Sequence, residues 1–440
     1  MTVLHFGLTP KMKPVSPRRA MTVAALDIGT SKVVCLIARL APHPPQDVLR
    51  RRSHGVQLMG FGHTAARGMK AGGVIDLVAA EEMVRQAIDM AESRAEVQLE
   101  SVVVSLSGGR LGSELFNASI DLGGDAVTDG DIARVLAAAS RHSVRDGRVV
   151  LHSLPTGYQL DAASGIHNPR GMIGRAFGVD MHMVTADAAI ARNLMLTVER
   201  SHLEVEAMVA SPYMAGLSVL ADDEADLGAA VIDMGAGTTT IAVFSGGRFI
   251  HASGFAVGGH HVTMDLARGL NARISDAERI KTFYGTVLTG GPDDRDMITV
   301  PPVGDDDREP PQFVSRETLV HMIKPRVEEI LEMVRDRLAA SPFAAEPRAR
   351  VVLTGGASQL VGLPELATRI LGRSVRIGRP LGFAGLPDSA KGPAFAVAAG
   401  LLVYPQAAHL EHFEPRRTRH LMTGTGGYMA KVGRWLRESF

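Results

Sequence analysis

The chain has 440 residues, 45% of them apolar and 21% charged, which is enough for two or more lobes with their own cores. Its 47 lysines and arginines equal its 47 aspartates and glutamates, and this balance argues against a role in binding nucleic acid. The single cysteine, Cys35, excludes an internal disulfide and fits a reducing compartment.

Residues 1–20 contain scattered basic side chains and no continuous apolar stretch. This pattern is not that of a secretory signal, and we expect a disordered extension before the first strand. No apolar run reaches the eighteen or so residues that a transmembrane helix needs. The best run, 394–404, predicts a buried helix instead.

A glycine-rich hairpin follows at residues 25–31, between apolar segments that predict strands at 23–26 and 33–40. Glycine lets backbone N–H groups close around phosphate oxygens, and hydroxyl side chains add further donors. The candidate phosphate-binding residues of this hairpin are Asp27, Gly29, Thr30, Ser31 and Lys32.

Residues 106–184 predict a strand, a helix and two further strands, with Thr128 or Asp129 as the N-cap of the helix. No phosphate-type loop occurs in this stretch. We therefore expect a small βαββ subdomain inserted into the first lobe, and a subdomain of this size without chemistry is more often a contact surface than a catalytic one.

A second hairpin with a similar sequence lies at residues 232–239. Its candidate phosphate-binding residues are Asp233, Gly235, Gly237, Thr238 and Thr239. A carboxylate beside a phosphate cradle repels the ligand unless a cation stands between them. The pairing of Asp27 with Asp233 therefore implies Mg²⁺, held through water. The alternative is two ordinary Asp-Gly turns in a sheet protein.

Two further segments could contact a nucleoside. Glu278 and Lys281 lie one turn apart on a predicted helix, where they could bracket a ribose or purine or form a plain surface ion pair. A buried strand at 351–354 runs into Gly355, Gly356 and Ser358 and then into a helix, which places backbone donors beside a phosphate or nucleoside edge. No zinc-type histidine spacing, Gly-x-Ser-x-Gly elbow or P-loop is present.

The last 36 residues change in composition. Residues 405–427 are polar, basic and glycine-rich, which predicts a flexible linker. Residues 428–440 predict an amphipathic helix at an anionic membrane surface, with an apolar arc opposite a basic one. Its candidate membrane residues are Tyr428, Met429, Lys431, Val432, Arg434, Trp435, Leu436, Arg437 and Phe440. The alternative is a helix that docks on the body of the protein or in the groove of a partner.

The order of these features resembles FtsA, the actin-like cell-division family of bacteria, from about Val23 to Phe440. The segment 258–263 is similar to the family's Gly-Gly-x-x-(Val/Ile)-Thr motif, and 277–281 to its Ala-Glu-x-x-Lys motif, in which the glutamate and lysine approach adenosine. Thr240 departs from the second aspartate of many actin-like relatives. Ser211 departs from a commoner glutamate.

The resemblance implies an α/β, actin/Hsp70-like two-lobe ATPase fold. Its implied divisions are an extension (1–20), subdomain 1A (21–105, completed by 185–220 and 376–404), an inserted subdomain 1C (106–184), subdomain 2A (221–255 and 329–375), subdomain 2B (256–328), the linker (405–427) and the amphipathic helix (428–440).

The implied function is that of an ATP-binding scaffold with at most weak ATPase activity. Such a scaffold polymerises, binds the C-terminal tail of FtsZ through subdomain 2B, and contacts neighbouring subunits or later divisome proteins through 1C. It fastens the Z ring to the cytoplasmic face of the inner membrane at the division site. A PilM-like adaptor of pilus assembly, an actin-superfamily kinase or ATPase, and an Hsp70-type chaperone stay as alternatives, although none of them needs the terminal amphipathic helix.

Overall fold

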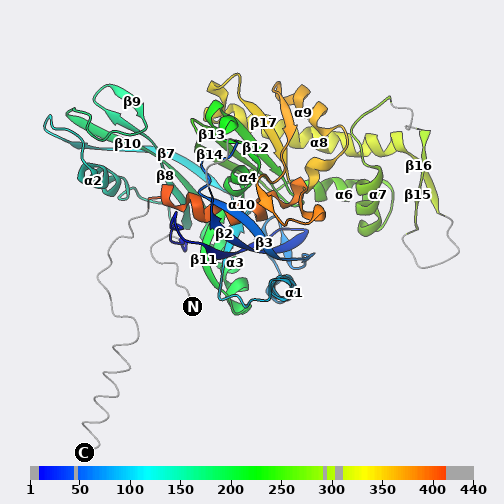
Figure 1. Ribbon diagram of the computed structural model, residues 1–440. Helices are drawn as coiled ribbons and strands as arrows, with labels where there is room; N and C mark the ends of the chain where they lie inside the picture. The colour runs from blue at the N-terminus through cyan, green and yellow to red at the C-terminus, as the bar shows by residue number, and fades with distance from the viewer. Residues whose placement is uncertain (1–8, 44–47, 291–294, 303–310, 413–440) are drawn as a thin grey trace, which may run out of the picture.

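The computed structural model describes residues 9–43, 48–290, 295–302 and 311–412. Two lobes, each built on a β-sheet, lie on either side of a central pair of helices (Figure 1). A small subdomain projects at one end, and the subdomain that carries β15 and β16 lies at the opposite end.

The first lobe contains a six-stranded sheet in the order β11-β6-β1-β2-β3-β19. Strands β1 to β3 are antiparallel, whereas β6 pairs in parallel with both β1 and β11. The strands are β1 (Met21–Ile28), β2 (Lys32–Pro42), β3 (His54–Ala65), β6 (Ser101–Leu106), β11 (Glu204–Ala210) and β19 (Phe383–Ala384), and helices α1 (Leu77–Ala95) and α3 (Ala188–Arg200) pack beside one another on this lobe.

The second lobe repeats this plan with a five-stranded sheet in the order β14-β13-β12-β17-β18. Strands β12 to β14 are antiparallel and β17 joins β12 in parallel, as β6 joins β1. The elements are β12 (Ala229–Met234), β13 (Thr239–Ser245), β14 (Arg248–Phe255), β17 (Arg350–Thr354), β18 (Val375–Ile377), α8 (Arg316–Ala339) and α9 (Leu363–Leu371). The repeat places the two predicted glycine-rich turns, β1–β2 and β12–β13, at equivalent positions in the two lobes.

The central helices are α4 (Ser211–Val219) and α10 (Ala396–Ala407), and they pack closely. A side-chain carbon at Gly400 would collide with the carbonyl oxygen of Met214, so glycine permits this approach. The stretch 393–410 is apolar and long enough to cross a membrane by composition, but 83% of it is buried inside the protein. It contains the buried helix predicted at 394–404, but α10 continues to Ala407 and residues 408–410 form a 3-10 turn. This corrects the expectation of a flexible linker from residue 405, because Pro405, Gln406 and Ala407 are buried in the helix, and residues 413–427 of that linker lie outside the described residues.

The inserted subdomain has a four-stranded sheet, β7-β10-β8-β9, covered by α2. Its elements are β7 (Gly112–Asp121), α2 (Asp129–Ala139), β8 (Arg148–Leu160), β9 (Ala163–Ile166) and β10 (Ala176–Asp187). Thr128 caps α2 in a capping box with Asp131. The short exposed strand β9 is an addition to the predicted βαββ pattern, because its four residues have no alternating apolar pattern.

The remaining elements flank the lobes. The region predicted as subdomain 2B contains α6 (Gly259–Gly269), α7 (Ile274–Tyr284), β15 (Met297–Val300) and β16 (Gln312–Ser315). The first lobe also carries β4 (Met69–Lys70) and β5 (Gly73–Val74). Helix α5 (Asp222–Leu227) precedes the second sheet.

Residues 9–12 and Val15 correct part of one expectation, because they contact the body of the protein, whereas residues 16–20 are exposed and residues 1–8 lie outside the described residues. Thr9 is buried, and its hydroxyl donates to the carbonyl oxygen of Val150 at 3.0 Å. Met12 is also buried, and Val15 N–H donates to the carbonyl oxygen of Pro405 at 3.2 Å. A proline-containing stretch without periodicity gives no sign in the sequence of the strands and helix that it will meet.

The described chain ends against the inserted subdomain. His412 N–H donates to the carbonyl oxygen of Ser153 in β8 at 2.9 Å, and Nδ1 of His152 lies 2.7 Å from Oε1 of the buried Glu411. The segment beyond His412 therefore starts at a fixed point beside β8.

Candidate functional site

A cleft of about 1330 Å³ lies between the two lobes, at the end of the central helices where α4 begins. Both hairpins, the start of α6, one face of α7 and the turn after β17 form its walls. The predicted site residues found on these walls are Asp27, Gly29, Thr30, Ser31, Lys32, Asp233, Gly235, Gly237, Thr238, Glu278, Lys281, Gly355 and Gly356.

The two hairpins close with the same hydrogen bond. Gly29 N–H donates to the carbonyl oxygen of Lys32, and Gly235 N–H donates to that of Thr238, both at 2.9 Å. The turns also approach one another across the cleft, because a side-chain carbon at Gly237 would collide with Thr30. The structure thus brings the two turns together in one site.

The two hairpin aspartates interact electrostatically. Asp27 accepts a hydrogen bond from Oγ of Ser105 at 2.5 Å, yet burial raises its pKa. Burial, and then the nearby Asp27 carboxylate, raise the pKa of Asp233 to about 7. Two carboxylates that resist ionisation together form a site that a cation would stabilise.

Lys32 supplies part of that positive charge. Its Nζ donates to the carbonyl oxygen of Ala394 at 2.5 Å and lies 3.6 Å from the centre of the Phe395 ring. Burial lowers the pKa of Lys32 to about 8, although both aspartates oppose this shift. The ammonium group is therefore held at the floor of the cleft, beside both carboxylates.

The start of α6 braces the second hairpin. Gly259 N–H donates to the carbonyl oxygen of Gly235 at 2.9 Å, and His260 N–H donates to that of Ala236 at 2.8 Å. A side chain at Gly258 would collide with these carbonyl groups, so glycine is required there. Helix α6 thus fixes the conformation of the second turn.

The turn after β17, formed by Gly355 and Gly356, lines the same cleft. Gly355 has φ +85° and ψ 165°, a conformation that only glycine adopts readily. A side-chain carbon there would collide with the carboxylate of Asp233 and the carbonyl oxygen of Met234. Gly355 N–H donates to the carbonyl oxygen of Pro393 at 3.1 Å, which ties this turn to the short 3-10 turn just before α10.

Glu278 and Lys281 form a network rather than an isolated surface pair. Lys281 Nζ lies 2.7 Å from Oε2 of Glu278, 2.8 Å from Oγ1 of Thr263 and 3.1 Å from the carbonyl oxygen of Gly259. Burial opposes ionisation of Glu278, but Lys281 and the Thr263 hydroxyl together hold its pKa below the usual value. The network joins α7 to the α6 helix that braces the second hairpin.

Two of the predicted site residues do not reach the cleft. Thr239 is buried, and its hydroxyl donates to the carbonyl oxygen of Val257 at 2.8 Å. Ser358 is also buried and donates to the carbonyl oxygen of Gly355 at 2.7 Å. Both hydroxyl groups stabilise the turns from behind, and this corrects the expectation that they contact a ligand directly.

Ser211 is a residue of this site that the sequence did not predict. It lines the cleft at the first position of α4, and its buried Oγ has no hydrogen-bond partner in the described part of the chain. No side chain caps this helix, and Pro212 follows. An unpaired hydroxyl at an uncapped helix N-terminus suits an anionic group or the water around it. The Ser-Pro pair at a helix start was the available signal.

No group of three or more histidine, cysteine, aspartate or glutamate side chains that could hold a metal occurs among the described residues. The pair of Asp27 and Asp233 could hold Mg²⁺ only if ligand oxygens and waters complete its shell. This donor set fits a magnesium ion that arrives with a phosphate ligand, since Mg²⁺ commonly keeps several waters.

Comparison with known proteins assigns the family. A model described as "Cell division protein FtsA" matches residues 230–400, and one described as "SHS2 domain inserted in FTSA" matches 108–185. The chain is 52% identical to the cell division protein FtsA of Agrobacterium fabrum over 99% of its own length and 98% of that protein. The chain belongs to the FtsA family. It is also 34% identical to FtsA of Escherichia coli K12, over 95% of this chain and 98% of that one.

Solved structures show the fold of this FtsA-family chain. The PilM-PilN type IV pilus biogenesis complex matches with a TM-score of 0.60 at 18% identity, over 87% of this chain and 98% of that one. MreB5 of Spiroplasma citri bound to ADP matches with a TM-score of 0.52 at 14% identity, over 89% and 98%. The expected actin-like two-lobe fold with its inserted subdomain is confirmed.

The predicted membrane segment lies outside the described residues. The assignment of Tyr428, Trp435, Phe440 and their neighbours to a lipid surface stays a prediction from the sequence.

Proposed function

We propose that this FtsA-family chain binds Mg·ATP in the cleft between its lobes. The observation that carries this proposal is the pair of matching turns, from equivalent strands of two lobes, that bring Asp27 and Asp233 together. Magnesium would neutralise these carboxylates against the phosphates. The backbone and hydroxyl groups of Gly29, Thr30, Gly235 and the residues beside them would surround the phosphates.

The adenosine end of the ligand would lie between α7 and the turn after β17. Lys281 and Glu278 hold one wall through Thr263, and Gly355 and Gly356 form the facing wall. A ligand that contacts both lobes favours a closed arrangement of the lobes, since its binding free energy depends on both walls. In this proposal ATP is chiefly a structural ligand, and hydrolysis is weak.

We propose further that the protein is a polymerising scaffold of the division ring. Subdomain 2B would bind the C-terminal tail of FtsZ, and the inserted subdomain would contact neighbouring subunits or later divisome proteins. Residues 428–440 would hold the assembly on the cytoplasmic face of the inner membrane. Two observations support this proposal: membership of the family, and the apolar and basic arcs of residues 428–440. Burial of the apolar side chains in lipid would contribute on the order of 10 kcal/mol of favourable free energy before the cost of ordering the segment.

Two measurements test this function. Calorimetric titration with ATP and Mg²⁺ should show binding that Asp233→Asn abolishes. Vesicles containing phosphatidylglycerol should sediment the full chain but not a chain lacking 428–440, and FtsZ should sediment only with the full chain. The absence of heat on titration contradicts the nucleotide site. Equal sedimentation of the truncated and full chains contradicts the membrane anchor.

A further inference from the structure

A second cavity, of about 590 Å³, lies at the other end of the central helices. The nucleotide cleft meets Ser211 and Pro393, at the starts of α4 and α10 or just before them, whereas this cavity meets Leu220 and Ala407 at their ends. Residues of the first lobe, the inserted subdomain and the second lobe all contribute to its walls. Neither the proposed function nor the family comparison assigns a role to it.

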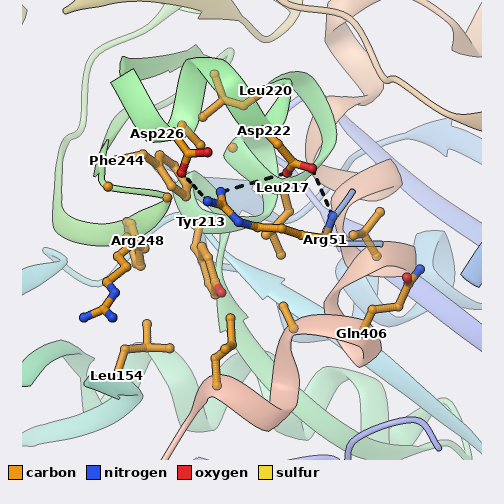
Figure 2. A pocket seen from close by; sticks show the side chains of 18 of the residues that line it. Arg51, Leu154, Tyr213, Leu217, Leu220, Asp222, Asp226, Phe244, Arg248 and Gln406 are labelled. Atoms are coloured by element: carbon orange, nitrogen blue, oxygen red, sulfur yellow. Dashed lines mark hydrogen bonds and ion pairs between the residues drawn. The ribbon is translucent and has the colours of Figure 1, made fainter. Parts of the chain in front are cut away.

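The walls of the cavity are mainly apolar. Leu154 comes from β8, Leu217 from α4 and Phe244 from β13 (Figure 2). Tyr213 stacks on Phe249 with ring centres 4.5 Å apart, so an aromatic pair forms part of the lining. These surfaces suit apolar and aromatic side chains.

The polar groups at the rim largely bond to one another. Arg51 N–H donates to Asp222 at 3.0 Å, and its guanidinium pairs with Asp226 (Figure 2). Arg248 bonds to the ring of His167 at 3.0 Å and to the carbonyl oxygen of Thr156. The rim therefore leaves the apolar interior as the main binding surface.

The chain itself passes the mouth of this cavity just before the described part ends. His409 and Leu410 line the cavity, and Leu410 is 49% exposed. His412, the last described residue, is hydrogen-bonded to Ser153, next to the lining residue Leu154. Residues 413–440 therefore leave from the edge of an apolar cavity.

We infer that residues 428–440, the predicted membrane segment, dock with part of their apolar arc in this cavity when no membrane is present. The segment carries an apolar arc that includes Trp435 and Leu436, and this arc needs cover in water. An apolar cavity of about 150 Å³ holds a benzene molecule. A cavity of 590 Å³ thus has room for an indole ring and aliphatic neighbours.

The linker makes this contact easy to reach. If residues 413–427 form the flexible linker that the sequence predicts, a chain of this length would have a root-mean-square span of about 21 Å, starting beside the cavity. A short flexible connection gives an effective concentration in the millimolar range. An intrinsic dissociation constant below about 1 mM therefore keeps the segment docked for most of the time.

Docking and membrane binding use the same apolar arc, so they exclude one another. This inference rests on the proposed membrane anchor. It adds that docking in the cavity limits how much of the segment is available to bind lipid. Because both lobes and the inserted subdomain form the cavity, a change in lobe closure at the nucleotide end would reshape it and release the segment. Helices α4 and α10 line both the cavity and the nucleotide cleft.

Fluorescence of the full chain without lipid tests the inference directly, because Trp435 is the only tryptophan. We expect a blue-shifted emission and an acrylamide quenching constant about threefold or more below that of the free 428–440 peptide. Leu410→Lys should red-shift the emission and restore quenching, since it places a charge at the cavity mouth. Leu227→Lys is the matched control, because Leu227 is 79% exposed and lies outside the cavity. Peptide-like quenching in the unmodified chain overturns the inference.

Disulfide trapping gives a second readout. The native Cys35 is fully buried, and burial raises its thiol pKa to about 12, so engineered cysteines react without interference. Ala221→Cys on the cavity wall should cross-link to Leu436→Cys, whereas Leu227→Cys should not. Equal cross-linking of both pairs also overturns the inference.

The vesicle assay separates this inference from the proposed function. Leu410→Lys should bind phosphatidylglycerol vesicles more tightly than the unmodified chain, by about threefold or more, because docking no longer competes. Unchanged vesicle binding contradicts the competition. Loss of all vesicle binding by the unmodified chain, with Trp435 still protected, contradicts the anchor but not the docked segment.

Discussion

Gly355 lies directly against the carboxylate of Asp233, and no side chain fits between them. The turn after β17 and the second hairpin are therefore a single unit, in which the backbone of one fixes the acidic group of the other. This contact joins the proposed adenosine and phosphate ends of the cleft.

Gly355→Ala should damage this unit. The alanine would have to adopt φ +85° and ψ 165° and displace Asp233, so we expect a loss of about 3 kcal/mol in unfolding free energy and of measurable ATP binding. Gly372→Ala is the control. Gly372 also has positive φ but open space around it, so only about 1 kcal/mol should be lost, with ATP affinity unchanged. Urea unfolding and calorimetric titration measure both effects, and equal losses would contradict the argument.

Asp233→Asn should stabilise the ligand-free protein at neutral pH. The folded-state pKa of Asp233 is raised to about 7 from an ordinary value of 3.8, so the folded state binds its proton more tightly than the unfolded state. The contribution of this group to stability is therefore present at pH 4 and lost as pH rises to 7. We expect Asp233→Asn to become more stable than the unmodified chain across this window, by on the order of 3 kcal/mol at pH 8.

Urea unfolding at pH 4.5, 6 and 8 measures the difference between the two proteins. A difference that is constant with pH would mean that the carboxylate ionises normally. The variant should also lose Mg²⁺-dependent ATP binding, which shows that the group is retained for binding rather than for stability.

Lys281→Met should weaken ATP binding by about tenfold, because it breaks the contacts that hold Thr263 and Glu278 and removes a charge-assisted hydrogen bond. The control is Arg279→Met on the same helix. Arg279 is more than half exposed, pairs only loosely with Asp276 at 3.8 Å and lies outside the cleft. If both variants bind ATP alike, α7 is not a wall of the nucleotide site.

A chain that begins at Met21 should be less stable than the full chain. It would lose the buried side chains of Thr9 and Met12 and the hydrogen bonds of Thr9 to Val150 and Met208. We expect a loss of about 2–4 kcal/mol, which thermal unfolding would show as a lower midpoint. An unchanged midpoint would mean that this segment contributes no net stability.

The sequence predicted the strands, turns and helix cap that are determined by residues close together in the chain. The strands around Asp27 and Asp233 show in their apolar runs, and their turns show in the glycines. The α2 cap shows in Thr128. Spacing could not reveal contacts that form only when distant segments meet.

Examples of such contacts are the bracing of Gly235 by α6 and the docking of residues 9–12 and Val15. Thr239 and Ser358 had suitable hydroxyl groups, but the fold turns both inward to carbonyl oxygens. The second cavity has no sequence pattern at all, because its walls come from separate parts of the chain.

The hydrogen bond between His412 and Ser153 has a mechanical consequence. If residues 428–440 anchor the chain as proposed, a pull from the lipid bilayer would act at His412, which is bonded to β8 of the inserted subdomain and follows the end of α10 by five residues. In a row of subunits of the kind proposed above, the spacing of lipid attachments would follow the spacing of the inserted subdomains. A bend in the bilayer would then be transmitted as a tilt of each one.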